Sequence, residues 1–198
     1  MSENCNKKPL IGRDLPQLRQ IVAGLGLPGY AATQIAQWLY EKRVTDIEQM
    51  TNLSKQARKR LAEEYCVGLM PPLMKAESTD GTIKYLFEGC GRRDIEAVYI
   101  PDRERATLCV SSQAGCKMGC KFCMTGRGSF QGQLTTAQII NQILSIENSE
   151  SLTNIVFMGM GEPTDNLDAV LHAIDILTAP WGMGWSPKRI TVSTVGNL

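Results

Sequence analysis

The sequence has almost no net charge, one histidine and no long apolar run, and each shortage removes a class of interpretation. The 21 basic and 20 acidic residues give a net charge of +1, so bulk charge offers no argument for nucleic-acid binding. No apolar stretch approaches the roughly 18 residues of a membrane span. Residues 1–8 are polar and lack the apolar core of a secretory signal, so we expect a cytoplasmic protein without a membrane segment.

The composition is otherwise that of a folded protein. Hydrophobic residues make up 43% of the 198 residues, enough for the core of one ordinary domain with a small appendage. Seven cysteines without a signal segment favour free thiols in a reducing compartment over a disulfide framework. We interpret the scattered Cys5, Cys66 and Cys90 as ordinary thiols.

The remaining chemistry centres on a cysteine cluster. Cys116, Cys120 and Cys123 follow the spacing C-x3-C-x2-C among several glycines, and thiolates bind zinc or iron–sulfur clusters. A structural zinc site needs four ligands, yet no cysteine follows Cys123 and the only histidine, His172, lies far along the chain. Three cysteines on a 4Fe-4S cluster leave one iron open to a substrate, and Phe122 would shield one side. A loop with three free thiols is the simpler alternative.

The first third of the chain predicts a helical unit. Apolar residues recur at helical spacing from 18 to 25 and from 35 to 40, and Ser54 is a candidate N-cap for a third helix. The basic run that begins at Lys55 is typical of a solvated helix face. A nucleic-acid-binding unit and a helical packing appendage both fit this pattern.

After Pro71-Pro72 the apolar period changes from helical to alternating. Three strands are predicted at 83–88, 95–100 and 106–112, as an antiparallel meander leading to the cysteines. Glu96 lies within the second strand, where a lone Glu is normally solvent-facing.

The last third predicts a β/α pattern. Thr135-Thr136 can cap a helix. The apolar pattern then predicts a strand at 154–158, a helix at 167–177 and a strand at 189–194. The fold class is therefore α/β, with a helical domain at 1–70, a β extension at 71–105 and the first part of a β/α barrel at 106–198. Only the strands 106–112, 154–158 and 190–194 belong to a barrel, so the chain looks truncated.

A second constellation follows the strand 154–158. In Gly159-Met160-Gly161-Glu162-Pro163, glycines let a ligand approach the backbone and Glu162 can accept hydrogen bonds from an ammonium group. Ser193 ends the next strand as a further polar contact. The alternatives are an ordinary turn and a satisfied strand-end hydroxyl.

Together these motifs resemble the RlmN/Cfr family of radical S-adenosylmethionine (SAM) methyltransferases, which modify an adenosine of large-subunit ribosomal RNA. The resemblance rests on four segments and covers roughly the first half of the family's usual length: Thr107–Gln113, the three-cysteine loop, Met158–Pro163 and Ile190–Thr194.

The resemblance implies roles for eight residues. Cys116, Cys120 and Cys123 would ligate a 4Fe-4S cluster whose open iron binds SAM, and an electron from the cluster would cleave SAM to a 5′-deoxyadenosyl radical. The SAM contacts would be Gly161, Glu162 and Ser193. Glu96 matches the family's proton acceptor, and Cys109 matches the Cys that releases the RNA adduct by forming a disulfide.

The motif details favour the RlmN branch, which methylates adenine carbon 2 in 23S rRNA and in tRNA. The alternatives are Cfr-like carbon-8 methylation and a non-catalytic iron–sulfur or RNA-binding module. A flavodoxin- or ferredoxin-type electron donor and a monomeric state are also expected. Gly128-Ser129-Phe130 and Gln133 depart from the family pattern, and the methyl-carrying Cys has no counterpart. We therefore expect this chain to be inactive in methyl transfer by itself.

Overall fold

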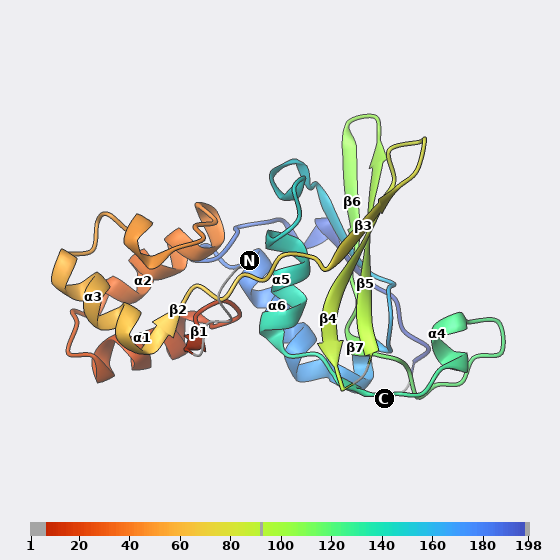
Figure 1. The fold of residues 1–198 in the computed structure, drawn as a ribbon, viewed down its shortest axis with the longest axis horizontal. Helices are drawn as coiled ribbons and strands as arrows, with labels where there is room; N and C mark the ends of the chain where they lie inside the picture. Colours follow the sequence, from red (N-terminus) through yellow and green to blue (C-terminus); the bar gives the residue numbers. More distant parts are fainter. Residues whose placement is uncertain (1–6, 92, 197–198) are drawn as a thin grey trace. The chain divides into compact units, whose positions relative to one another are not determined.

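The structure, a computed structural model, describes residues 7–91 and 93–196 (Figure 1). The chain divides into two compact units. One combines the residues up to Met70 with Ile174–Trp185, and the other combines Pro71–Ala173 with the residues from Ser186 onward. No helix in the described part of the chain is both long enough and apolar enough to span a bilayer.

The first unit is helical, as the sequence predicts. Its helices are α1 (Leu15–Gly24), α2 (Tyr30–Ala36), which continues into a π-helical turn, and α3 (Lys55–Glu64). The predicted cap is confirmed, because the Ser54 side chain accepts a hydrogen bond from the Ala57 amide. A short parallel ladder between β1 (Lys8–Pro9) and β2 (Tyr65–Cys66) joins the two ends of this helical segment.

The second unit is built on a six-stranded mixed sheet of order β10-β9-β6-β5-β4-β3. The strands are β3 (Met74–Glu77), β4 (Ile83–Cys90), β5 (Arg93–Asp102), β6 (Arg105–Cys109), β9 (Asn154–Phe157) and β10 (Ile190–Val192). The strands β6, β9 and β10 run parallel, and β3 to β6 form the antiparallel meander. The expected change from a meander to a β/α pattern is therefore confirmed.

β3, β6 and β10 differ from the sequence prediction. β3 was not expected, because its four residues are too short a signal and all of them are exposed; its pairing with β4 creates it. The predicted strand 189–194 is a ladder only over Ile190–Val192, so Ser193 follows the strand and does not end it. The predicted strand 106–112 is paired as a strand only as far as Cys109. Beyond it, the amides of Val110 and Ser112 still donate hydrogen bonds to the carbonyls of Val156 and Met160.

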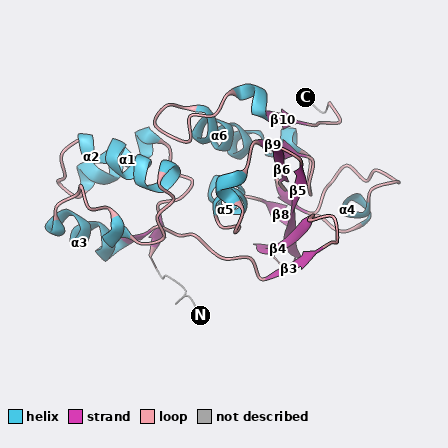
Figure 2. Ribbon diagram, turned by 90° about the horizontal axis from the view of Figure 1, so that it is seen from above, coloured by secondary structure: helices cyan, strands magenta, loops and turns pink. Residues whose placement is uncertain are grey.

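Helices cover one face of the sheet. α5 (Thr136–Leu144) begins with a capping box in which Thr135 and Gln138 exchange hydrogen bonds, as Thr135-Thr136 predicts. α5 and the first half of α6 (Leu167–Thr178) lie on the same side of the strands (Figure 2). The core lies between these layers and buries alternate strand residues, including Tyr85, Phe87, Ala97, Leu108 and Phe157.

The opposite face carries the half-exposed alternate residues. In register across the strands, Val98 lies opposite Cys109, Cys109 opposite Val156, and Val156 opposite Thr191. Side chains of a strand alternate between faces, so Glu96 shares this face with Val98 and Cys109. The short helix α4 (Met124–Arg127) also lies on this side (Figure 2). In β/α barrels the face without helices lines the interior, so this face is where we place the candidate site.

Candidate functional site

The cysteine loop is closed at its base by a small ladder. β7 (Gln113–Ala114) pairs antiparallel with β8 (Gly132–Gln133), which brings the two ends of the loop together. Gly115 has φ +89°, and a Cβ at this position would collide with the Ser129 carbonyl. A side chain at position 115 would therefore open the ladder that holds the loop.

The three thiols of the loop are partly buried and free of disulfides. Backbone turns link their neighbourhoods: the Cys123 amide donates to the Cys120 carbonyl at 3.0 Å, and the Met118 amide donates to Cys116 Sγ at 3.5 Å. Over residues 7–91 and 93–196, no three His, Cys, Asp or Glu side chains converge closely enough to hold a metal ion. The donor chemistry fits an iron–sulfur cluster, and ligation would draw the thiols together.

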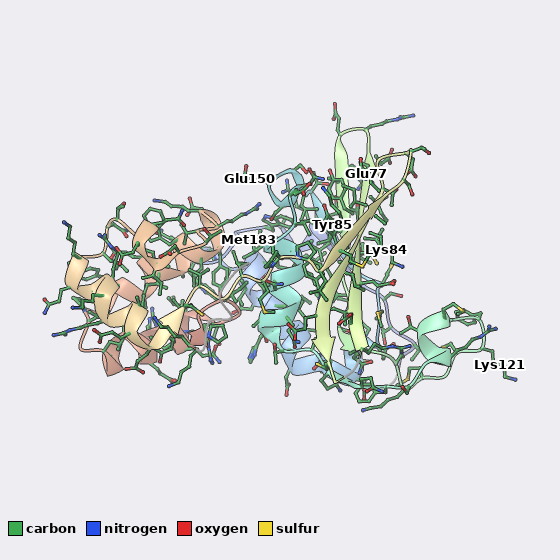
Figure 3. The ribbon with its side chains drawn as sticks, in the orientation of Figure 1. Glu77, Lys84, Tyr85, Lys121, Glu150 and Met183 are labelled. Atoms are coloured by element: carbon green, nitrogen blue, oxygen red, sulfur yellow. The ribbon has the colours of Figure 1, made fainter. Side chains whose placement is uncertain are left out.

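Phe122 does not shield the thiols in this structure. Its side chain is 90% exposed, and that of Met124 is 75% exposed. Lys121 projects outward from the same part of the loop (Figure 3). The shielding of a cluster by Phe122 stays a prediction.

The turn after β9 packs against the strand that precedes the cysteine loop. Gly161 has φ +102°, and a Cβ there would lie 2.6 Å from Gln113 Cβ. The next amide, of Glu162, donates to Gln113 Oε1 at 2.8 Å. Only glycine permits this backbone conformation and this close approach, so Gly161 sets the shape of the turn.

Glu162 is a buried carboxylate with both oxygens occupied. Its side chain is 3% exposed. Oε1 accepts from the amide and hydroxyl of Thr164 at 3.1 and 2.7 Å, and Oε2 accepts from the Val195 amide at 3.1 Å. Burial raises the pKa, but hydrogen bonds from Thr194, Thr164 and Val195 outweigh it and leave the pKa below its ordinary value. The carboxylate thus stays ionised and joins the turn after β9 to the segment after β10.

We expect Glu162→Gln to be less stable than the wild type by about 2 kcal/mol at pH 7, because an amide offers one acceptor and would turn its NH2 toward a donor. The lowered pKa means that the ionised carboxylate contributes stability above the ordinary value of 4.5 and loses it as pH falls below that value. The difference between the two proteins should therefore shrink on acidification.

Denaturant unfolding of both proteins between pH 7 and pH 3 measures this difference. Glu104→Gln, in the exposed turn between β5 and β6, is the matched control. An unchanged gap across the pH range would show that the charge on Glu162 does not stabilise the fold.

Glu96 and Cys109 lie on the same face of the sheet, on adjacent strands. Glu96 Oε1 is 2.6 Å from Lys84 Nζ, an ion pair that is about half exposed. Figure 3 shows Lys84 and its neighbour Tyr85 on opposite sides of β4. Burial raises the pKa of the Cys109 thiol against the opposing hydrogen bond from the Met158 amide, so the thiol is protonated at neutral pH.

Ser193 is exposed immediately after β10, next to the segment that Glu162 binds. The structure therefore brings Gly161, Glu162 and the residues after β10 to one end of the parallel strands. Glu96 and Cys109 occupy the neighbouring face of the sheet. The three cysteines lie in the loop that leaves β7 at the same edge, and the assigned roles of all eight residues stay predictions.

Sequence reasoning missed the polar residues that link these parts. Gln113 is completely buried and contacts Glu162, Gln133 and Asp165. Lys117, inside the cysteine motif, pairs with Asp165 at 3.0 Å. The one available signal was the polar run Ser111-Ser112-Gln113 directly after an apolar strand, which is unusual for a buried segment.

Comparisons with known proteins agree in both units. Residues 8–67 match the model of the ribosomal RNA large subunit methyltransferase N-terminal domain, and residues 110–198 match that of the radical SAM superfamily. A probable dual-specificity RNA methyltransferase RlmN of Phocaeicola vulgatus is 59% identical over 96% of the chain and 54% of the relative. The dual-specificity RNA methyltransferase RlmN of Bdellovibrio bacteriovorus is 46% identical over 92% and 47%.

A solved structure is similar as well. The radical SAM methyltransferase from Sphaerobacter thermophilus superposes with a TM-score of 0.85 at 37% identity, covering 94% of this chain and 57% of that protein. The chain thus spans about half the length of the curated relatives it matches.

Proposed function

We propose, from the premise that this chain belongs to the RlmN family of the radical SAM superfamily, that it supplies the cofactor-binding part of an RNA methyltransferase. The superfamily implies a 4Fe-4S cluster and SAM as cofactors. The observation that carries the proposal is the joining of the three-cysteine loop to the Gly161–Glu162 turn, through Gln113, at the ends of parallel strands. The substrate would be RNA, as the names of the relatives support. Adenine carbon 2 of ribosomal and transfer RNA is the target that the family resemblance implies.

Each site residue has a role in this proposal. Cys116, Cys120 and Cys123 would hold the cluster, and the turn at Gly161 and Glu162 would bind the amino group of SAM. Ser193 would add a polar contact from the segment after β10. The bound cofactors supply the one-electron chemistry that unreactive ring carbons require.

Glu96 and Cys109, on the sheet face without α5 and α6, would act in proton transfer and in sulfur chemistry. Glu96 would accept a proton from the methylated base, and the Lys84 ammonium, 2.6 Å from its Oε1, would hold the carboxylate in place. Cys109 would act as a thiol in release of the product, and its protonated state keeps it inert until a base or sulfur partner approaches.

The organisation of the chain follows the same proposal. Residues 1–70 would form a helical accessory domain that contacts RNA, 71–105 a β extension, and 106–198 the first part of the radical SAM barrel. We also propose a cytoplasmic monomer that receives its electron from a flavodoxin- or ferredoxin-type donor.

The proposal is tested by reconstituting the 198-residue chain with iron and sulfide without oxygen and recording its EPR spectrum. We expect a reduced 4Fe-4S signal that shifts when SAM is added, and no methylation of 23S rRNA or tRNA by this chain alone. A cluster indifferent to SAM would contradict the proposed cofactor site. Methylation by the isolated chain would show that it needs no further Cys.

A further inference from the structure

Asp165 lies between the two halves of the proposed cofactor site. It belongs to the short 3-10 turn Pro163–Asn166, which starts directly after Glu162. Its Oδ2 accepts from Gln113 Nε2 at 2.7 Å and from Lys117 Nζ at 3.0 Å. Its backbone carbonyl accepts from Gln133 Nε2 at 2.6 Å. One acidic residue therefore contacts both strands at the base of the cysteine loop and a lysine within it.

Gln113 connects this carboxylate to the turn. Its amide oxygen accepts from the Glu162 amide at 2.8 Å, while its nitrogen donates to Asp165 and to Gln133 Oε1, both at 2.7 Å. The side chain is wholly buried and all of these contacts are satisfied. A displacement of Asp165 would leave one N–H of the buried Gln113 amide without its acceptor, which costs more than the loss of a surface hydrogen bond.

Lys117 brings the cysteine motif into the same network. It follows Cys116 directly, and its ammonium lies 3.0 Å from Asp165 Oδ2 and 4.5 Å from the centroid of the Phe130 ring. The Lys117 hydrogen bond, ahead of the Gln113 bond, holds the pKa of Asp165 below its usual range despite partial burial. Lys117 therefore links the start of the loop, next to Cys116, to Phe130 near its end.

We propose that Lys117, Asp165 and Gln113 act as a positioning network that sets where the cysteine loop lies relative to the Gly161–Glu162 turn. The proposal rests on the proposed function, since it assigns these residues to the geometry of SAM binding. None of them needs to touch the cofactor. The network prearranges the open side of the cluster and the site for the SAM amino group, so that less ordering is left for binding.

The simpler alternative is that Lys117 and Asp165 form an ordinary surface ion pair with no effect on cofactor binding. The Lys117 side chain is 47% exposed, and isolated exposed pairs contribute about 0–1 kcal/mol to stability. The difference here is that Asp165 is 22% exposed and shares its oxygen with a buried amide. The network predicts an effect on ligand affinity that exceeds any effect on global stability.

The test compares four single variants of the 198-residue chain after cluster reconstitution. Lys117→Met and Asp165→Asn keep the shape of each side chain and remove the charge. Lys121→Met, within the same motif but with its side chain projecting outward, is the matched control (Figure 3). We expect the first two to weaken SAM binding about tenfold, equivalent to about 1.4 kcal/mol, and Lys121→Met to bind as the wild type does. Lys117→Arg should restore most of the affinity.

The double variant Lys117→Met/Asp165→Asn separates a shared role from two independent ones. A shared role predicts that it binds SAM no worse than either single variant, with melting temperatures and iron contents matched throughout. Tenfold losses that multiply in the double variant, or SAM affinities equal to the wild type, would overturn the proposal.

A second readout needs no cofactor. In the cluster-free chain, the amide protons of the segments 114–118 and 160–166 should exchange faster in both charge-removing variants, and not in Lys121→Met. If the wild-type chain fails to bind SAM, the proposed function fails, and the exchange data alone decide whether the network holds the two segments together. Unchanged exchange in both segments would refute it.

Discussion

Replacing Cys120 by Ser is expected to abolish cluster assembly in this chain. The loop between β7 and β8 offers three thiols, and its sequence contains no His, Asp, Glu or fourth Cys that could replace a lost ligand. A serine hydroxyl is not deprotonated at neutral pH and binds iron poorly beside thiolates. Two remaining thiolates cannot retain a 4Fe-4S cluster that already has one iron without a protein ligand. Iron and sulfide content after anaerobic reconstitution should fall to the background level.

Cys66→Ser serves as the control for this result. Cys66 is also outside any disulfide, it is partly buried, and it belongs to the helical unit rather than to the loop. We expect its cluster content to equal that of the wild type. Cys116→Ser and Cys123→Ser should behave as Cys120→Ser does. Full iron content in any of these three variants would remove that residue from the ligand set, and stoichiometric zinc without sulfide would replace the cluster by a zinc site.

Gly161→Ala is expected to produce a large loss of stability. The residue has φ +102°, which side chains rarely adopt, and the new Cβ would lie 2.6 Å from Gln113 Cβ. Strained backbone costs about 1–3 kcal/mol, and overpacking adds about 1–3 kcal/mol more. We expect a decrease of about 3–4 kcal/mol in the free energy of unfolding, and no detectable shift of the EPR signal with SAM.

Gly184→Ala separates the two causes. Gly184 also has a left-handed backbone, with φ +64°, but a Cβ there would meet no atom within 4 Å. It should therefore lose only the backbone term, about 1 kcal/mol. Denaturant unfolding of both variants measures the difference. Equal losses would mean that the contact between Gly161 and Gln113 is not tight in solution.

Local sequence signals were sufficient for most of the fold. The capping residues Ser54 and Thr135 mark helix starts because a side-chain acceptor is needed within three residues of the cap, a purely local requirement. The alternation in 83–88 and 95–100 predicts strands with one buried face, and both form. The same local reasoning identified the C-x3-C-x2-C loop, since three ligands close in sequence need no fold to be recognised as candidates.

Local sequence signals did not predict elements whose structure depends on a partner elsewhere in the chain. β3 forms because β4 offers a free edge, and its own four residues are exposed and too few to indicate a strand by themselves. The shielding of a cluster by Phe122 stays a prediction, because the residue is 90% exposed and only a bound cluster would show what it covers.

By itself, the sequence determined the candidate chemical groups of this protein: three clustered thiols, a glycine-rich turn with Glu162, and their resemblance to a known family. Only the tertiary structure decided how these parts are joined. Gln113 meets Asp165 across 52 positions, and Lys84 reaches Glu96 across the β4–β5 pair. Such contacts depend on strand register and loop closure, which place distant residues within a few ångströms, and no spacing along the chain encodes them.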